Sequence, residues 1–204
     1  MIATQARLLD VPMAALYPLG SSREAIAEAN TLLVDRWQHR LGPVHRPFRQ
    51  EAFVLELLGE VVAVAISAST VSDTVAGYRR GQVVELARLA GEPWATRVML
   101  RLWREVCAPS WGSWRPQAAI SYSHNAMHRG DLYRFDGWER VTDQAGKSGG
   151  GGAWSRPRYA GDVVKGSKTL WVWRYGAKSR TVIRVSGSQP GQALDRDPAP
   201  EPRP

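Results

Sequence analysis

The alternation of hydrophobic and polar positions divides the chain into short helices and strands. Residues 21–24 (SSRE) have the spacing of a helix N-terminal capping box, and apolar residues follow them at helical intervals, which predicts a helix over 22–40. The rest of the pattern predicts, in chain order, strands over 53–58 and 61–70 around Gly59-Glu60, a loop over 72–81, a strand over 83–90, a helix over 95–106, a strand over 118–123, a helix over 126–135 ending at Gly137, and strands over 138–141 and 169–175.

This order of elements favours an α+β fold. A helix and an antiparallel hairpin precede strand-helix-strand-helix-strand-strand, which predicts a mixed, mostly antiparallel sheet with a parallel crossover in its middle. We expect a single domain over residues 1–176, with a flexible insertion at about 142–168, and a disordered polar tail over 177–204, where proline is frequent. Residues 38–48 (QHRLGPVHRPF) are broken by glycine and proline and predict an exposed loop.

Composition supports a folded protein of the cytoplasm. The chain has 204 residues, of which 44% are hydrophobic, enough for one core. No apolar run approaches the ~20 residues that a membrane helix needs, and the first residues lack the pattern of a secretory signal. Cys107 is the single cysteine, which excludes an internal disulfide.

Positive charge is concentrated late in the chain. The net charge is +8, yet residues 1–75 carry 6 basic and 8 acidic side chains, whereas residues 141–204 carry 11 and 5. Cations interleaved with aromatic rings suit a nucleic acid whose phosphates are neutralised and whose bases are stacked or flipped. An ordinary basic loop beside a strand is the alternative. The aromatic residues in the basic segment 147–184 are Trp154, Tyr159, Trp171, Trp173 and Tyr175.

Two segments are similar to the second half of the GCN5-related N-acyltransferase (GNAT) fold. They are VVELARLAGEPWATRVMLRLW (83–103) and, after a strand, NAMHRGDLYRFDGW (125–138). The resemblance implies that strand 83–90 binds the pantetheine arm of acetyl-CoA or a related acyl-CoA, that the turn 91–97 holds its pyrophosphate, and that Tyr133 protonates the leaving thiolate. The cofactor-binding residues so implied are Leu86, Ala87, Arg88, Leu89, Gly91, Thr96 and Arg97.

Within that superfamily the chain resembles the bacteriophage Mom-type DNA-modification proteins more closely. The shared features are the strand residues 85–89, Ser121-Tyr122, the block from His128 to Gly137-Trp138, and a first helix that ends in tryptophan and histidine, Trp37 and His39. This resemblance implies modification of the exocyclic amine of a flipped adenine in double-stranded DNA, which protects phage DNA from host restriction. Two positions depart from the pattern: Pro93-Trp94 in the expected pyrophosphate turn, and His124 where an aspartate is common.

Acyl transfer to an amine needs a base, an acid for the leaving group, and groups that orient the reactants. Glu85 is the candidate base or water-positioning group, with an ion pair to Arg88 as the alternative. Tyr133 is the candidate acid, with packing on the sheet as the alternative. Ser121 is a candidate for polarising a carbonyl, and His39 for shuttling a proton.

Strand periodicity separates Ser121 and Ser123 from Tyr122. The two serines point to one face and the tyrosine to the other, so only one set is expected to face the cleft. Plain strand hydroxyls are the alternative for the serines. The residues Trp37, Tyr122 and Trp138 are candidates for holding an extruded base.

Histidine spacing also permits a metal site. His124 and His128 are four residues apart and would share one face of a helix, and two further histidines precede them. We nevertheless favour a site without a metal, in which the histidines contact DNA or carry protons. The predicted nucleic-acid contacts are Arg40, His45, Arg46, Tyr122, His128, Arg129, Arg156 and Arg158.

Two rival functions remain open on sequence alone. The first is a generic GNAT acetyltransferase for a small amine or a protein lysine. The second is a non-catalytic DNA-binding protein on a GNAT scaffold, which Pro93-Trp94 favours and for which binding would depend steeply on salt.

Overall fold

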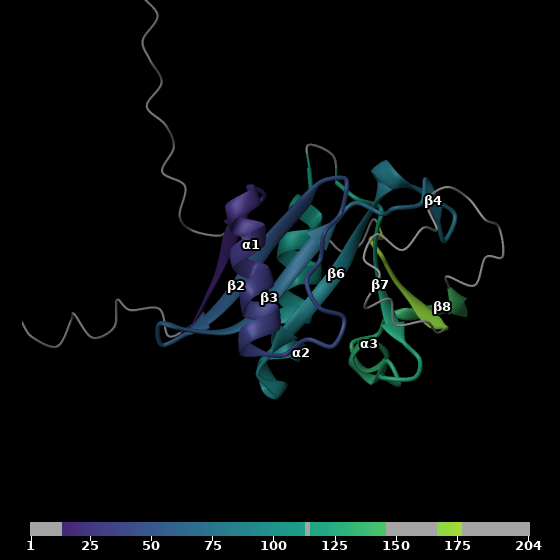
Figure 1. Cartoon of the computed structure of the whole chain (residues 1–204). Helices are drawn as coiled ribbons and strands as arrows, with labels where there is room; N and C mark the ends of the chain where they lie inside the picture. Colours follow the sequence, from purple (N-terminus) through teal and green to yellow (C-terminus); the bar gives the residue numbers. More distant parts are fainter. Residues whose placement is uncertain (1–13, 113–114, 146–166, 177–204) are drawn as a thin grey trace, which may run out of the picture.

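A computed structural model describes residues 14–112, 115–145 and 167–176 (Figure 1). Seven strands form one twisted sheet in the order β1-β2-β3-β6-β7-β9-β8, and two short strands form a separate ribbon. The strands are β1 (Ala14–Gly20), β2 (Gln50–Leu57), β3 (Glu60–Ala68), β4 (Thr74–Val75), β5 (Tyr78–Arg79), β6 (Val83–Gly91), β7 (Ala118–His124), β8 (Glu139–Ala145) and β9 (Lys168–Arg174).

Strand pairing confirms the expected mixed sheet. β2 and β3 form the antiparallel hairpin around Gly59, β6 and β7 are parallel, and β9 returns antiparallel to β7. The pattern did not indicate the edge strand β1, nor the short ribbon β4-β5, which lies within the expected loop 72–81. β1 pairs with β2 and contains Pro18; proline has no N–H to donate, so within sheets it is largely confined to edge strands.

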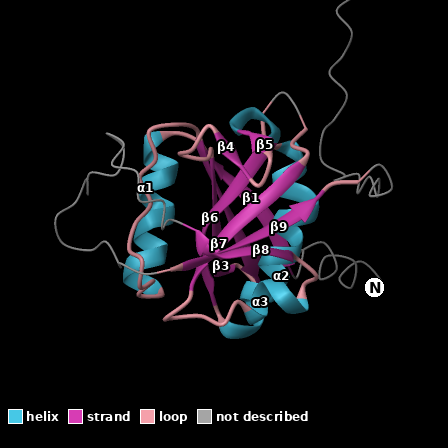
Figure 2. Ribbon diagram, turned by 90° about the vertical axis from the view of Figure 1, so that its right-hand side faces the viewer, coloured by secondary structure: helices cyan, strands magenta, loops and turns pink. Residues whose placement is uncertain are grey.

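Helices cover both faces of the sheet. The helix α1 (Arg23–Thr31) lies on one face, and α2 (Pro93–Leu102) and α3 (Asp131–Phe135) lie on the other (Figure 2). α1 begins where the side chain of Ser22 accepts a hydrogen bond from the Ala25 N–H, at 3.1 Å, and it continues as a π-helical turn to Arg36. α2 continues in the same way to Cys107.

α3 is shorter than the pattern predicted. It starts at Asp131 because Gly130, with φ +74, turns the chain immediately before it, so residues 125–130 form a loop. His124 ends a strand and His128 lies in this loop. The expectation that both histidines could share one helical face is therefore wrong.

Two hydrophobic clusters fill the space between sheet and helices. Met99 of α2 and Trp103 of the π-helical turn after it share a cluster with Leu86, and the buried Trp103 indole donates to Ser67 Oγ at 2.8 Å. Trp138 belongs to the same cluster, with 5% of its surface exposed, and its ring stacks with that of Trp103. Trp138 is thus a core residue and not a holder for an extruded base, because it is already enclosed. The second cluster lies beneath α1 and includes Leu33.

The middle of the sheet is open. The parallel pairing of β6 with β7 joins only Val83–Leu86 to Ala118–Ser121, and both strands continue past these pairs. The β3–β6 register shifts next to this point, leaving Ala87 as an extra residue in β6. Such a bulge bends a strand and increases its twist. β6 and β7 consequently part at their carboxyl ends.

Some expectations lie partly outside the described residues. The strands β8 and β9 take in residues 142–145 and 168 of the expected insertion, and the remainder of the insertion and the expected tail are outside the described ranges. None of the helices in the described part has the length and apolarity required to cross a membrane.

Candidate active site

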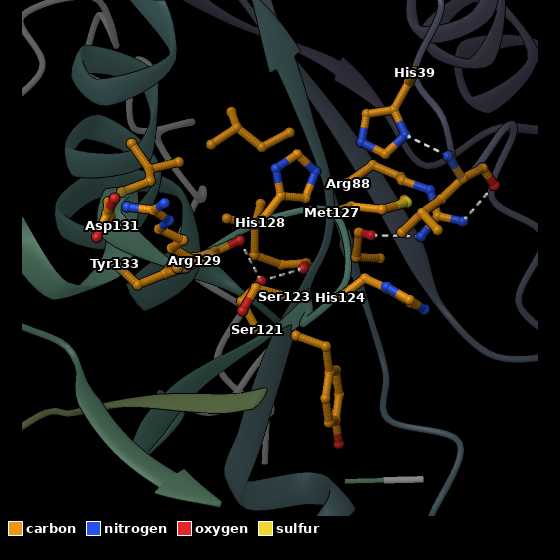
Figure 3. Close-up of a pocket in the computed structure, with 17 residues that line it drawn as sticks. His39, Arg88, Ser121, Ser123, His124, Met127, His128, Arg129, Asp131 and Tyr133 are labelled. Carbon is orange, nitrogen blue, oxygen red and sulfur yellow. Dashed lines mark hydrogen bonds between the residues drawn. The ribbon is translucent and has the colours of Figure 1, made fainter. Parts of the chain in front are cut away.

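A cavity of about 360 Å³ lies where β6 and β7 part (Figure 3). Side chains from both faces of the sheet line it. Tyr133 approaches from α3 on one side, and His39 and Arg88 approach from the side of loop 38–48. The strand residues Leu86 and Ser121 lie between them. The cavity therefore brings together residues that the sequence places far apart.

Tyr133 and Ser121 form a hydrogen-bonded pair at the inner end of the cavity. Their hydroxyl oxygens are 2.8 Å apart, and Ser121 Oγ donates to the Leu86 carbonyl at 3.0 Å. Because the serine proton is directed to Leu86, the tyrosine hydroxyl donates to Ser121. Burial raises the pKa of the Tyr133 phenol above its ordinary value, so this group keeps its proton at neutral pH. The proton can be turned toward a leaving group in the cavity.

Packing fixes the position of Tyr133. Its ring stacks on Trp171, with centroids 5.7 Å apart, and meets Trp138 edge to face at 5.5 Å. Gly130 permits this arrangement, because an added Cβ at this residue would lie 2.3 Å from the Trp171 indole. The single-turn helix α3 thus presses the tyrosine against the sheet at a defined site.

Glu85 is held in a buried ion pair. Its side chain is 5% exposed and its carboxylate contacts the guanidinium of Arg46 from loop 38–48. Arg88, the partner that the alternative expected, instead donates to the Gly42 and Leu41 carbonyls, both at 3.1 Å. Burial raises the pKa of the Glu85 carboxyl, and the positive charges of Arg46 and Arg88 oppose this shift. Glu85 therefore holds the loop to β6, one residue before Leu86, which lines the cavity.

His39 faces the cavity as a neutral ring. Its Nδ1 accepts a hydrogen bond from the Leu41 N–H at 3.3 Å, which places the proton of the neutral imidazole on Nε2. Burial, with smaller contributions from Arg88 and His128, lowers its pKa from 6.5 to about 4. At neutral pH the ring is accordingly a hydrogen-bond donor toward the cavity and a poor base.

Acid is expected to destabilise the protein through His39. The folded pKa lies below the ordinary value of 6.5, so the contribution is fully present above pH 6.5 and is lost as the pH falls through about 4. The loss should reach about 3 kcal/mol at most. Urea unfolding at neutral and acidic pH should show that His39→Gln reduces this dependence. Equal acid sensitivity in His39→Gln and the unsubstituted protein would contradict the expectation.

Within residues 14–112, 115–145 and 167–176, no strand pairs with the edge of β6 beyond Leu86 on the β7 side. Ala87, Arg88 and Leu89 occupy this edge and line the cavity. An extended chain carrying amide groups can run along such an edge and form strand-like hydrogen bonds. These are residues to which the resemblance assigns the pantetheine arm.

The turn between β6 and α2 is tighter than expected. Gly91 belongs to the strand, and an added Cβ would lie 2.5 Å from the Val62 carbonyl oxygen, so sheet packing requires this glycine. Only Glu92 separates the strand from Pro93, which has no N–H. Glu92 is the backbone acceptor for the Ala95 and Thr96 N–H groups, at 2.9 and 3.0 Å.

This geometry does not favour the phosphate-binding roles expected of Gly91 and Thr96, which stay predictions. Neither contributes to an open loop, and the Thr96 hydroxyl donates to the Pro93 carbonyl at 3.0 Å. Within the described residues, the Trp94 N–H is the first helical donor without a partner, and Arg97 is exposed nearby on α2. A pyrophosphate here would depend on these two groups.

The predicted nucleic-acid contacts are dispersed. His128 and Arg129 are exposed at the rim of the cavity, and Arg40 lies near enough for its charge to help burial lower the pKa of His128. Arg46 is engaged by Glu85. Tyr122 lies on the opposite face from Ser121, as expected, but both line the cavity, so the expectation that only one set would face it is wrong. Burial raises the pKa of Tyr122 to about 12. His45 is exposed, and Arg156 and Arg158 lie outside the described residues.

Sequence reasoning missed the combination of His124 and Lys168. His124 is 2% exposed, lines the cavity, and has no hydrogen-bond partner for either ring nitrogen among the described residues. Lys168 lies directly opposite it in the β7–β9 pairing. The two-residue alternation of β7 predicts that His124 lies on the same face as Tyr122. The proximity of Lys168 to His124 follows only from the pairing of β9 with β7. No three potential ligands among the described histidine, cysteine and acidic residues are grouped to bind a metal.

Comparison of the sequence with models of known families and with curated proteins finds no match. Solved structures do match. A probable acetyltransferase from Staphylococcus epidermidis is 9% identical, with a TM-score of 0.51, over 80% of this chain and 100% of its own. Two further matches are the IAA acetyltransferase from Bacillus cereus and the ribosomal-protein-S18-alanine N-acetyltransferase from Escherichia coli. The first is 15% identical, with a TM-score of 0.47, over 79% of this chain and 100% of its own. The second is 14% identical, with a TM-score of 0.45, over 78% of this chain and 91% of its own. The chain therefore has the fold of the GNAT acetyltransferases.

Proposed function

We propose that the protein is an N-acyltransferase that transfers an acyl group from acetyl-CoA or a related acyl-CoA to a primary amine. The observation that carries the proposal is the Tyr133–Ser121 hydroxyl pair at the point where β6 and β7 part. The proton of Tyr133 is held there by a neutral serine. It lies beside a strand edge that has backbone groups available for an extended ligand.

The residues present offer more contacts to the pantetheine arm of an acyl-CoA than to its pyrophosphate. Ala87 and Leu89 would hold the pantetheine arm along the unpaired edge of β6, and Leu86, the last residue paired with β7, would contact its end. The Trp94 N–H and Arg97 would contact the pyrophosphate, with fewer donors than an open loop supplies. When bound, the cofactor supplies an activated thioester.

Residues on the two faces of the sheet would have separate roles. Tyr133 would deliver its phenolic proton to a sulfur leaving group, since its hydroxyl is the proton donor at the inner end of the cavity. Arg88 and His39 would orient the amine from the other face. Glu85, held by Arg46, would stabilise positive charge that develops on the amine nitrogen as the new C–N bond forms.

The test combines cofactor binding with product analysis. Calorimetry should detect binding of CoA, and incubation with acetyl-CoA and a panel of primary amines should release free thiol and yield an acylated amine by mass spectrometry. Absence of both CoA binding and thiol release above the protein-free rate would reject the proposal. Salt-dependent DNA binding in that case would favour a non-catalytic DNA-binding role.

Modification of DNA adenine is a narrower version of the same proposal. The net charge of +8 and the exposed Arg40, His128 and Arg129 around the cavity favour a polyanionic acceptor. Nucleoside mass spectrometry on DNA from cells that express the protein should then detect a modified deoxyadenosine. A profile restricted to the four standard deoxynucleosides, with acylation of a small amine in vitro, would favour the broader proposal alone.

A further inference from the structure

Positive charges outnumber negative ones on the loop side of the cavity. Arg46 and Arg88 lie near Glu85, and Lys168 is close enough for both arginines to act on its charge. Burial and then these two arginines lower the pKa of Lys168, and burial with Arg46 lowers that of Arg88 to about 10. One carboxylate therefore balances three cations.

Only part of this cluster is satisfied by the protein. Glu85 pairs with Arg46, and Arg88 is bonded to backbone carbonyls. Lys168 has neither a hydrogen bond nor an ion pair within the described residues. The Arg46 Nε and both nitrogens of His124 are buried and have no partner there. Buried polar atoms without partners are uncommon because each costs free energy, so the Arg46 and His124 nitrogens indicate room for a ligand beside the half-buried Lys168.

The unsatisfied groups lie on one face of the sheet. Lys168 and His124 form a cross-strand pair, and side chains of such pairs are neighbours on the same face. Tyr122, two residues before His124, shares that face, and Glu85 acts on the charge of its phenol. Figure 3 shows Arg88 and His124 on the same side of the gap, facing the cavity.

We infer that the acceptor amine carries a carboxylate or phosphate group, which binds between Lys168, Arg88 and His124 beside the reacting amine. The inference rests on the proposed acyltransferase function and names the class of its acceptor. An anion here completes the hydrogen bonds of Lys168 and His124 and offsets the excess positive charge. The same cations favour the neutral, nucleophilic form of a nearby amine, since they oppose a further positive charge.

Burial favours a small acceptor. His124 is 2% exposed, so its ring nitrogens reach only a group that enters the cavity. The cavity volume of about 360 Å³ accommodates an amino acid or a small phosphorylated amine. A surface that binds the backbone of a polymer would instead present its cations to solvent, as the exposed Arg129 does.

Matched pairs of amines test this inference by direct binding. Calorimetry would compare glycine with glycinamide, and phosphoethanolamine with ethanolamine, using the full chain with and without CoA. The anionic member of at least one pair should bind roughly 10- to 100-fold more tightly than its neutral analogue. The pair with the larger ratio identifies carboxylate or phosphate as the preferred group. The same order is expected for kcat/KM in acetyl transfer.

Two substitutions and one control assign the effect to the cluster. Lys168→Met should remove most of the preference for the anion, and His124→Phe should reduce it while filling a similar volume. Arg115→Met removes one positive charge from an exposed position before the start of β7, at the other end of the strand from His124, and should leave the preference unchanged. Thermal unfolding of each variant verifies that it is folded.

Each remaining outcome bears on the inference. Equal binding of anionic and neutral members overturns it, and acylation of both members would still support the proposed function. An equal effect of Lys168→Met and Arg115→Met overturns it in favour of a general electrostatic field. Binding of duplex DNA without binding of small anions overturns it in favour of a nucleic-acid surface. Selective anion binding without any acyl transfer supports the anion site and rejects the proposed function.

Discussion

Replacing Tyr133 with phenylalanine is expected to lower kcat/KM for acyl transfer by roughly 100- to 10,000-fold, the range associated with loss of a general acid. The phenolic proton, held by Ser121 at 2.8 Å, disappears while the ring keeps its contacts with Trp138 and Trp171. CoA binding by calorimetry should change little. Thiol release measured with saturating cofactor and a responsive amine provides the readout.

Tyr17→Phe is the matched control for this substitution. Tyr17 lies on the edge strand β1 with 43% of its surface exposed, so loss of its hydroxyl should leave transfer unchanged. Tyr133→Phe also gives up one buried hydrogen bond, worth about 1 kcal/mol of stability, which does not unfold an ordinary domain. Retention of more than about a third of the rate in Tyr133→Phe would remove the tyrosine from the proposed acid role.

Substituting Gly130 with alanine is expected to lower the free energy of unfolding by about 3–5 kcal/mol, combining backbone strain with overpacking. The residue has φ +74, and an alanine Cβ would lie 2.3 and 2.8 Å from two atoms of the Trp171 indole. Urea unfolding monitored by circular dichroism would measure the loss. Because Gly130 precedes α3, any folded fraction should also have a displaced Tyr133 and reduced activity.

Gly59→Ala separates the two contributions. Gly59 has a comparable φ of +83 in the β2–β3 turn, yet nothing lies within 4 Å of an added Cβ. Its substitution should therefore cost only the backbone term, about 1–2 kcal/mol. Similar losses for the two alanine variants would show that Trp171 yields without cost and that its packing does not determine the position of α3.

The central strands could be predicted from sequence because strands buried on both faces are encoded by nearly continuous apolar runs. β6 and β7 pack on both faces, and the runs that encode them remain visible in the sequence. β1 escaped prediction because an exposed edge strand needs little hydrophobic alternation. The start of α3 was misplaced because Gly130 provides a break that helical periodicity alone does not reveal.

The candidate site could be predicted in part for a similar reason. Tyr133 and Ser121 belong to one short block, and strand alternation already separated Ser121 from Tyr122. The ion pair between Arg46 and Glu85 joins a loop to a strand 39 residues later, and Lys168 meets His124 only through strand order. Such contacts depend on tertiary packing, which local pattern does not encode.

The short contact between β6 and β7 also has a mechanical consequence. It divides the sheet into a four-stranded part, β1-β2-β3-β6, and a three-stranded part, β7-β9-β8, which share only the pairs from Val83–Ala118 to Leu86–Ser121. These pairs lie at the amino ends of the two strands. A small rotation about them would therefore widen the gap at the opposite end without breaking a strand pair within either part.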